Sequence, residues 1–516
     1  MRVALIETPL MLRNSLNVSI LTALSSAIAL VYQVVLAMTF GTGADMDIYL
    51  CSVSVPLTLI GIFAGVLGYK LVPALQSAAI RNGSSDQLVR TLSLGLGGTT
   101  LLLGIIGCFF AKELIPSLNL NRMLTERVIA IQIANVAWLW LPLAVLSYIY
   151  TAALHIRSRF ISAALCQSLP TVGALAGCLI GRYQWGLSAL VWGQFLGFFI
   201  MFCFLLKLVG QTQSGYDWVG FRRLIAHLPM AFIALLIFVM YPVADSILGS
   251  LVGPSAISYL GYAQRLVVGI ASLAVAGATT VLFPLLARQA ARGDEQAVRT
   301  NLIAGLRAIL LVLTPTTSLL GIFSLPVTKL IFQRGAFSST NSLELAELIP
   351  FILLGIVAAS CMTLIFKVLF AKGDIYFAAG ISLLGTSIYF VVPILLVERW
   401  GLKGIGSAYV ASWWVVLIVS LRKLLKNNVW QYSSQSHVFF TKSLALATIA
   451  VLVIGYIGNI FLPSEDTEPN LITNLFIIAI TSGIALGAYL LILYARSISE
   501  ILYVFQKCKC YVINAK

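Results

Sequence analysis

The stretch SSDQLVRT, Ser84–Thr91, recurs in the second half of the chain as GDEQAVRT, Gly293–Thr300. Both copies are polar segments that stand between long apolar runs, and both keep the pattern Gln-x-Val-Arg-Thr. Hydrophobic patterning alone explains matches between apolar runs, but it does not explain matching polar residues outside them. The recurrence therefore indicates that a unit of several helices has been duplicated.

The composition identifies the environment of these helices. Of the 516 residues, 60% are hydrophobic and only 10% are charged, and the mean hydropathy is +0.98. So few polar side chains cannot cover the surface of a water-soluble fold of this size. The sequence therefore predicts an all-α integral membrane protein.

The chain contains about fourteen apolar runs of roughly 20 to 30 residues. Each run is long enough to cross a hydrocarbon layer of about 30 Å as a helix, whereas barrel strands would be shorter and alternating. We expect the first run to remain as a helix, because it is too long for a signal peptide. The runs are 15–40, 48–75, 91–111, 128–154, 160–181, 186–207, 225–249, 256–287, 301–330, 342–371, 375–397, 403–421, 439–462 and 471–495.

Lys and Arg residues concentrate in alternate connections between the runs, and loops rich in these residues stay in the cytoplasm. This bias predicts that both termini are cytoplasmic and that the acidic segment PSEDTEPN, residues 463–470, faces outside. The net charge of +15 then reflects orientation in the membrane. We therefore expect no nucleic acid partner.

The repeat extends beyond the opening stretch, since QWGLSALVWGQF at 184–195 realigns with RWGLKGIGSAYV at 399–410. We therefore predict two six-helix lobes in parallel orientation, residues 1–210 and 211–428, followed by two appended helices and a cytoplasmic tail in residues 429–516. Two such lobes are typical of alternating-access transporters, in which the substrate binds between the repeats.

Five segments resemble the MurJ/MviN-type flippases of the multidrug/oligosaccharidyl-lipid/polysaccharide exporter superfamily. They are FGTGADMDIYL (40–50), VADSILGSLVGPSAISYLGYAQRLV (243–267), FPLLARQAARGD (283–294), IFQRGAF (331–337) and FAKGD (370–374). The resemblance implies a transporter that moves undecaprenyl-pyrophosphate-linked sugars from the inner to the outer leaflet of a bacterial inner membrane. It also implies that the two appended helices form a groove for the lipid tail.

The sequence departs from this family in its first lobe. The family's lipid II flippases carry arginines at positions that match Tyr32 and Ser26, an arginine pair near Ile60 and Gly61, and a Glu-Gly-Ala motif where this chain reads AGV at 64–66. Without these charges, a pyrophosphate with peptide carboxylates meets less positive potential. We therefore expect another lipid-linked glycan, such as an exopolysaccharide precursor, as the cargo, with lipid II as the alternative.

Ionisable residues inside membrane helices are costly and mark candidate functional sites. Arg265 is the best candidate for substrate contact, because a guanidinium can bind phosphate oxygens bidentately, and we place Gln264 beside it in the same site. The structural alternative is an ion pair between Arg265 and Asp245. Asp245, which follows Pro242, could also serve as a coupling site for a cation. Asp47 lies at a helix start, where capping is the favoured explanation over coupling.

Two further basic residues lie within about two turns of predicted helix ends. Arg307 and Lys367 could meet a pyrophosphate that enters from the cytoplasm, and we include both among the candidate substrate-binding residues. The structural alternative, which we favour, is that their long side chains reach the membrane surface.

The sequence predicts a transporter without catalytic residues. It contains no Gly-rich phosphate loop for ATP hydrolysis and no cysteine or histidine spacing typical of a metal site, so we expect no cofactor and no metal. The expected partners are the polyprenyl-linked glycan, membrane lipids, a coupling cation and a downstream glycan polymerase. A cation-coupled drug antiporter and a membrane glycan polymerase or ligase are alternatives from other classes, which would require acidic residues in the first lobe or a long outer loop.

Overall fold

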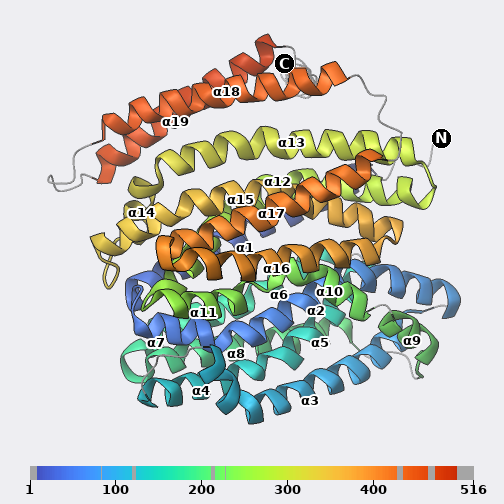
Figure 1. The fold of residues 1–516 in the computed structure, drawn as a ribbon. Coiled ribbons are helices and arrows are strands. Elements are labelled where there is room, and N and C mark those ends of the chain that lie inside the picture. Colours follow the sequence, from blue (N-terminus) through green and yellow to red (C-terminus); the bar gives the residue numbers. More distant parts are fainter. Residues whose placement is uncertain are drawn as a thin grey trace. The chain divides into compact units, whose positions relative to one another are not determined.

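The computed structural model describes residues 8–496 apart from 83, 119–123, 158, 211–214, 227, 427–433 and 463–470. In these residues the regular secondary structure is helical (Figure 1). The helices are α1 (Thr8–Phe40), α2 (Ala44–Asn82), α3 (Asp86–Leu118), α4 (Leu124–Trp138), α5 (Trp140–Ile156), α6 (Phe160–Gln167), α7 (Leu169–Trp185), α8 (Leu187–Val209), α9 (Trp218–Ala226), α10 (Leu228–Val239), α11 (Tyr241–Val252), α12 (Ala256–Ala291), α13 (Glu295–Ile322), α14 (Ser324–Phe332), α15 (Ser339–Lys372), α16 (Ile375–Trp400), α17 (Leu402–Lys426), α18 (Ser434–Ile460) and α19 (Leu471–Ala495).

Each of the fourteen predicted runs corresponds to one helix or to two consecutive helices. Four runs are broken, and they form the pairs α4 and α5, α6 and α7, α10 and α11, and α13 and α14. Helix α9 corresponds to no predicted run. It is short, and it places Trp218 and Val219 as well as Arg222 and Arg223 at the surface.

The described residues include 11 helices that are long and apolar enough to cross a membrane, and up to 12 if the bent pair of α9 and α10 forms one span. Helices α1 and α12 cover two further predicted runs. The predicted architecture of about fourteen membrane helices therefore agrees with the structure.

The chain divides into two compact units. Unit 1 consists of residues 1–269, 334–341 and 374–408, and unit 2 consists of residues 270–333, 342–373 and 409–516. Helix α12 contributes residues 256–269 to unit 1 and residues 270–291 to unit 2. The division into lobes at residues 210 and 428 stays a prediction.

Corresponding turns of the two repeats have the same backbone geometry. Gly186 ends α7 with φ 51° and ψ −128°, and Gly401 ends α16 with φ 50° and ψ −129°. Only glycine adopts this region without a steric cost, which explains why both repeats read Trp-Gly-Leu at this point. The shared geometry is what a duplication of helices predicts.

Helices α7 and α8 pack through their glycines in unit 1. A Cβ atom on Gly193 of α8 would lie 2.4 Å from the Gly173 carbonyl oxygen of α7, so a larger residue would force the two helices apart. Consecutive residues of a helix point about 100° apart. The neighbouring Gln194 therefore faces a different side of α8 and is free to contact α2.

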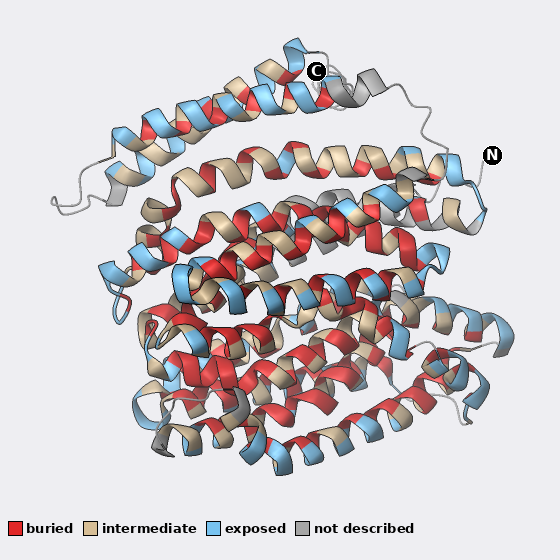
Figure 2. Ribbon diagram, in the orientation of Figure 1, coloured by how far each residue is buried: buried red, intermediate tan, exposed pale blue. Residues whose placement is uncertain are grey.

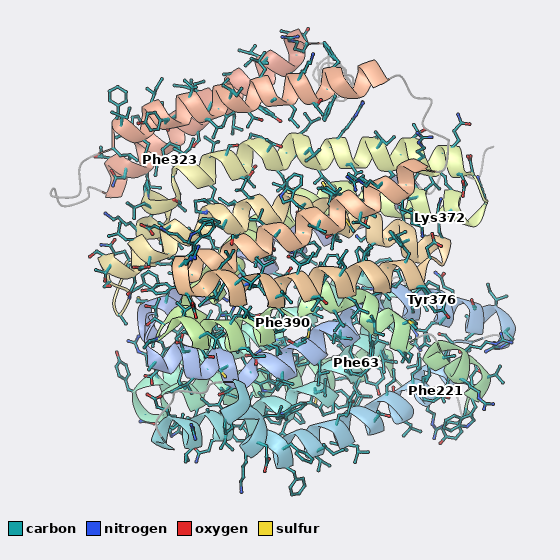
Figure 3. The ribbon with its side chains drawn as sticks, in the orientation of Figure 1. Phe63, Phe221, Phe323, Lys372, Tyr376 and Phe390 are labelled. Carbon is teal, nitrogen blue, oxygen red and sulfur yellow. The ribbon has the colours of Figure 1, made fainter. Side chains whose placement is uncertain are left out.

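In unit 2, α15 is a central helix and α19 is a peripheral one. Of their most apolar stretches, 72% is buried in α15 but only 11% in α19, a difference that Figure 2 shows. Phe323, labelled in Figure 3, lies at the break between α13 and α14. It belongs to a buried cluster with Phe440 of α18 and Tyr489 of α19. The two appended helices thus join unit 2 through α13.

Candidate functional site

Arg265 is the tenth residue of α12, and its side chain is half-buried. Its Nη1 donates a hydrogen bond of 3.2 Å to Gln33 Oε1 of α1. Within the described residues the structure records no carboxylate that pairs with this guanidinium. A cation in a membrane-spanning helix that is held by a neutral amide is an attractive partner for an anion.

A chain of neutral polar side chains lies beside Arg265. The hydroxyls of Tyr32 in α1 and Tyr49 in α2 are 3.3 Å apart, and the Tyr49 hydroxyl donates to Gln194 Oε1 of α8 at 3.3 Å. Gln33, which accepts the hydrogen bond from Arg265, directly follows Tyr32 in α1. Three helices of the first repeat therefore present hydroxyl and amide groups, rather than cations, next to the buried arginine.

Asp245 of α11 is buried and belongs to a separate cluster. Its Oδ2 accepts a 2.8 Å hydrogen bond from the Gln264 side chain, and its Oδ1 accepts one from the Tyr389 hydroxyl of α16. The ring of Tyr389 also packs edge-on against Tyr241, at 4.7 Å between the ring centroids. Pro242, in the first turn of α11, marks the break between α10 and α11 that precedes this carboxylate.

The ion pair between Asp245 and Arg265, one of the alternatives that the sequence left open, is not formed in the structure. Gln264, the neighbour of Arg265, takes the position beside Asp245 instead. Consecutive residues of an α-helix point about 100° apart, so residues 264 and 265 cannot both face the same partner. The two charged groups that the sequence suggested as a pair therefore belong to different clusters.

Asp47 is completely buried in the first turn of α2, and it caps a different helix. Its two carboxylate oxygens accept hydrogen bonds of 2.8 Å from the backbone amides of Ser255 and Ser258, at the N-terminus of α12, and the Ser258 hydroxyl donates to it as well. A carboxylate at this position is stabilised by the helix dipole and by amides that have no partner within the helix. The capping that the sequence favoured is therefore present, but it joins α2 to α12.

Three of the five segments that carry the family resemblance meet near this cap. The Tyr262 hydroxyl of α12 donates to the Gly41 carbonyl oxygen at 2.9 Å, and the Ala336 amide donates to the Met38 carbonyl oxygen, also at 2.9 Å. The ring of Phe337 packs edge-on against that of Tyr262. The motifs FGTGAD, YAQRL and FQRGAF, which are far apart in the sequence, are thus contact partners within unit 1.

The two other candidate substrate contacts lie in unit 2. The guanidinium of Arg307 in α13 lies over the ring of Phe440 in α18, 4.8 Å from the ring centroid. Lys367 is a partly buried residue of α15. Whether Arg307 and Lys367 contact a substrate stays a prediction.

Lys70 of unit 1 lies just beyond the apolar span of α2, which ends at Gly68. Partial burial lowers the pKa of this lysine. The charged form of Lys70 is therefore less favoured than that of a fully exposed lysine. Among the described residues, the structure records no acidic partner for it.

The neutral network was missed by sequence reasoning because its members are ordinary residues in membrane helices. Tyr32 and Tyr49 are separated by 17 residues and Tyr49 and Gln194 by 145, so only the packing of α1, α2 and α8 brings them together. Two signals were available: Tyr32 stands where the resembling family carries an arginine, and the absence of any Lys or Arg between Arg13 and Lys70 showed that polar contacts there lack a cation.

Comparison with known proteins identifies a matching family. A family model described as "Lipid II flippase MurJ" matches residues 36–468. A probable lipid II flippase MurJ of Buchnera aphidicola is 22% identical over 483 residues, which cover 87% of this chain and 90% of the relative. The lipid II flippase MurJ of Burkholderia cenocepacia is 22% identical over 460 residues, which cover 85% of this chain and 88% of the relative.

Solved structures with the same fold are similar to almost the whole chain. The inward closed conformation of a lipid II flippase MurJ matches with a TM-score of 0.76 at 18% identity, covering 91% of this chain and 97% of that structure. An inward-facing multidrug transporter of the MATE family, from the MOP superfamily, matches with a TM-score of 0.61 at 12% identity, covering 80% of this chain and 96% of that structure. At these identities the likeness establishes the fold alone.

Proposed function

The chain belongs to the MurJ family of lipid II flippases, and on this premise we propose that it moves lipid II, the lipid-linked precursor of peptidoglycan, from the inner to the outer leaflet of a bacterial inner membrane. The observation that carries the proposal is Arg265, a half-buried cation in a membrane-spanning helix whose hydrogen-bond partner among the described residues is the neutral amide of Gln33. Such a guanidinium can bind the diphosphate of a polyprenyl-linked substrate.

The proposal changes the order of the two cargoes that the sequence suggested. The relatives with a printed activity are lipid II flippases, which favours lipid II over an exopolysaccharide precursor. One observation still favours the second cargo: no Lys or Arg occurs between Arg13 and Lys70, so residues 14–69 offer no cation to the peptide carboxylates of lipid II. Another undecaprenyl-diphosphate-linked glycan is therefore the second candidate.

Complementation separates the two cargoes. The chain is expressed in a strain that is depleted of its own lipid II flippase, and the leaflet position of lipid II is followed in the same cells. Rescue of growth together with lipid II on the outer leaflet would support the first cargo. Failure to rescue, with the protein inserted in the membrane and stable in detergent, would exclude lipid II and leave the second cargo.

The transport cycle that we propose is alternating access between two pseudo-repeated lobes, with both termini in the cytoplasm. Of the roles that the sequence left open for Asp245, a structural one is supported best, because each of its carboxylate oxygens already accepts a hydrogen bond, from Gln264 and from Tyr389. A fluorescent protein that folds only in the cytoplasm, fused to the C-terminus, should fluoresce. A dark fusion in a correctly inserted protein would reverse the proposed orientation.

A further inference from the structure

Helix α9 has one buried face and one exposed face, a difference that Figure 2 shows. Gly220 and Leu224 lie on the buried face. Phe221, labelled in Figure 3, packs on α3, since a side chain at Gly95 would overlap its ring. The buried face of α9 is therefore occupied by the protein itself.

The start of α9 is fixed to α2 and α3 by Asp217, which is 6% exposed. Its backbone amide donates a 2.9 Å hydrogen bond to the Thr91 hydroxyl of α3, and its carboxylate pairs with Arg81 at the end of α2. The carboxylate also accepts a 2.8 Å hydrogen bond from the Gly220 amide in the first turn of α9. Thr91 ends the recurring stretch 84–91, so one function of that stretch in the first repeat is to hold α9.

The exposed face of α9 combines large apolar side chains with two cations. Trp218 and Val219 are each 58% exposed, and Arg222 and Arg223 are exposed one turn further along. Residues four apart lie on the same side of a helix, so these four side chains form one surface, which we call the α9 surface. The single acidic residue of segment 207–226 is Asp217, which is buried and paired. The α9 surface is therefore cationic as well as apolar.

The level of α9 in the membrane follows from α3. The apolar span of α3 has 31 residues, Asp86–Pro116. As a helix it is about 46 Å long, more than the hydrocarbon layer of about 30 Å, so its first and last turns lie among the lipid headgroups. Helix α9 contacts α3 at Thr91 and Gly95, within its first three turns. This contact places α9 near the boundary between headgroups and hydrocarbon.

Both kinds of side chain on the α9 surface suit this boundary. Tryptophan is enriched where hydrocarbon meets the headgroups, whereas in water an exposed tryptophan and valine gain nothing. Two neighbouring arginines would be costly among lipid tails, but a guanidinium binds phosphate oxygens bidentately. The surface thus fits an anionic lipid layer better than it fits water or hydrocarbon.

We propose that the α9 surface binds anionic phospholipids, with Arg222 and Arg223 on their phosphate groups and with Trp218 and Val219 inserted beside the first acyl carbons. In the orientation proposed above, these lipids belong to the cytoplasmic leaflet. The site is separate from Arg265 and does not depend on which cargo is transported. Because Asp217 fixes α9 to α2 and α3, the bound lipids hold this end of the first repeat at the membrane surface.

The experiment measures how brominated phospholipids quench the fluorescence of Trp218. The full-length protein is reconstituted into phosphatidylcholine bilayers, in which a rising fraction of the lipid is replaced by brominated phosphatidylglycerol, which is anionic, or by brominated phosphatidylcholine, which is neutral. The chain has nine tryptophans, so the Trp218 signal is the difference between each protein and the same protein with Trp218→Phe.

Two double variants are compared with the wild type. Arg222→Gln with Arg223→Gln removes the cations of the α9 surface and keeps their polar character. Lys112→Gln with Arg399→Gln is the matched control, because it removes two exposed cations from α3 and α16 and changes the net charge equally. Thermal unfolding of every protein is followed in the same bilayers.

The proposal expects phosphatidylglycerol to quench Trp218 at an about tenfold lower lipid fraction than phosphatidylcholine does. Each cation near an anionic surface contributes a preference of about fivefold, and the α9 surface has two. The Arg222→Gln and Arg223→Gln variant should quench equally with both lipids, and the control should keep the wild-type preference.

Three results would contradict the inference. Equal quenching of the wild type by both lipids would mean that α9 lies in the interface without selecting anionic headgroups. No quenching by either lipid would show that water or another protein covers the α9 surface. A preference for phosphatidylglycerol that persisted in the Arg222→Gln and Arg223→Gln variant would place the anionic lipid elsewhere. None of these results depends on lipid II, so failure of the proposed cargo leaves this test unaffected.

Discussion

The cluster of Asp245, Gln264 and Tyr389 and the cluster of Arg265 and Gln33 include consecutive residues of α12, Gln264 and Arg265. The two clusters differ in how many hydrogen bonds the protein makes to the charged group. In the first, each carboxylate oxygen of Asp245 accepts a hydrogen bond, one from Gln264 and one from Tyr389. In the second, Arg265 donates one hydrogen bond to Gln33. The carboxylate cluster is closed by the protein, whereas the guanidinium cluster keeps donors for a ligand. A closed cluster is expected to contribute mainly to stability, and an open one mainly to binding.

Removal of the open cation tests the comparison most strongly. Arg265→Ala should reduce transport of the lipid-linked substrate by about a hundredfold or more, because a charge-assisted bidentate contact with the diphosphate is lost. The unfolding temperature in detergent should change little, since the cluster contributes little to stability. Transport is measured as lipid II that reaches the outer leaflet.

Lys112→Ala is the control for this variant, because Lys112 is an exposed cation of α3. It removes the same charge from the protein without changing the cluster. Normal transport by a stably folded Arg265→Ala variant would place the substrate elsewhere and end the distinction between an open and a closed cluster.

Removal of the Asp245 carboxylate should lower the stability of the protein more than it lowers transport. Asp245→Ala removes the buried acceptor of the hydrogen bonds from Tyr389 and Gln264, and the loss of these two bonds should cost about 2 to 4 kcal/mol of stability. Asp245→Asn keeps an acceptor oxygen and nearly the same volume, so it should lose less. Thermal unfolding in detergent measures both. If Asp245→Ala unfolded at the wild-type temperature, the cluster could not be called closed by its hydrogen bonds.

A single substitution can convert the open cluster into a closed one. Gln33→Glu places a carboxylate within 3.2 Å of Arg265, at the position of the present amide oxygen, and gives the guanidinium an anionic partner inside the protein. The substrate must then compete with this carboxylate, so binding of undecaprenyl diphosphate should weaken about tenfold. The unfolding temperature should be unchanged or higher.

Gln33→Asn is the matched control for this prediction, because it keeps the amide and adds no charge. Equal affinity of the Gln33→Glu variant and the wild type for undecaprenyl diphosphate would mean that the anion does not use the face of Arg265 that Gln33 contacts.

The sequence was sufficient to predict the spans and the buried charges but not how the charges pair. Fourteen long apolar runs define the helices because hydropathy is a local property. Arg265 and Asp47 stood out because each is a charge near or inside an apolar run. The pairing of Arg265 with Asp245 was only an assumption from opposite charge. The pair is not formed because the direction of a side chain depends on its position around the helix. Residues 264 and 265 point in different directions, so they belong to two different clusters.

The neutral part of the site could not have been predicted in the same way. A tyrosine or glutamine in a membrane helix is common, and nothing in the local sequence of Tyr32 or Gln194 separates a ligand-binding residue from a packing one. Their contacts depend on how α1, α2 and α8 pack, and part of that packing follows from the glycines of α7 and α8. Helix α9 was missed because it has only nine residues, too few for a hydropathy window, and because Arg222 and Arg223 interrupt its apolar residues.

Asp47 is a third buried charge, and it provides the smallest test of the same comparison. It resembles the closed Asp245 cluster, except that backbone amides of the α12 N-terminus supply the donors at Ser255 and Ser258. Asp47→Asn keeps one acceptor oxygen, but it turns an amide group toward a backbone donor and removes the charge that the helix dipole stabilises. We expect a loss of about 1 kcal/mol, seen as a small decrease in the unfolding temperature.

Ser258→Ala, which removes only the hydroxyl donor to Asp47, should have a smaller effect than Asp47→Asn, because both backbone donors remain. The order of these two variants is the informative measurement. If Ser258→Ala were the more destabilising, the hydroxyl rather than the helix N-terminus would hold the carboxylate, and Asp47 would depend on side-chain donors just as Asp245 does. If Asp47→Asn instead abolished substrate binding without a change in stability, Asp47 would belong with Arg265 among the open groups.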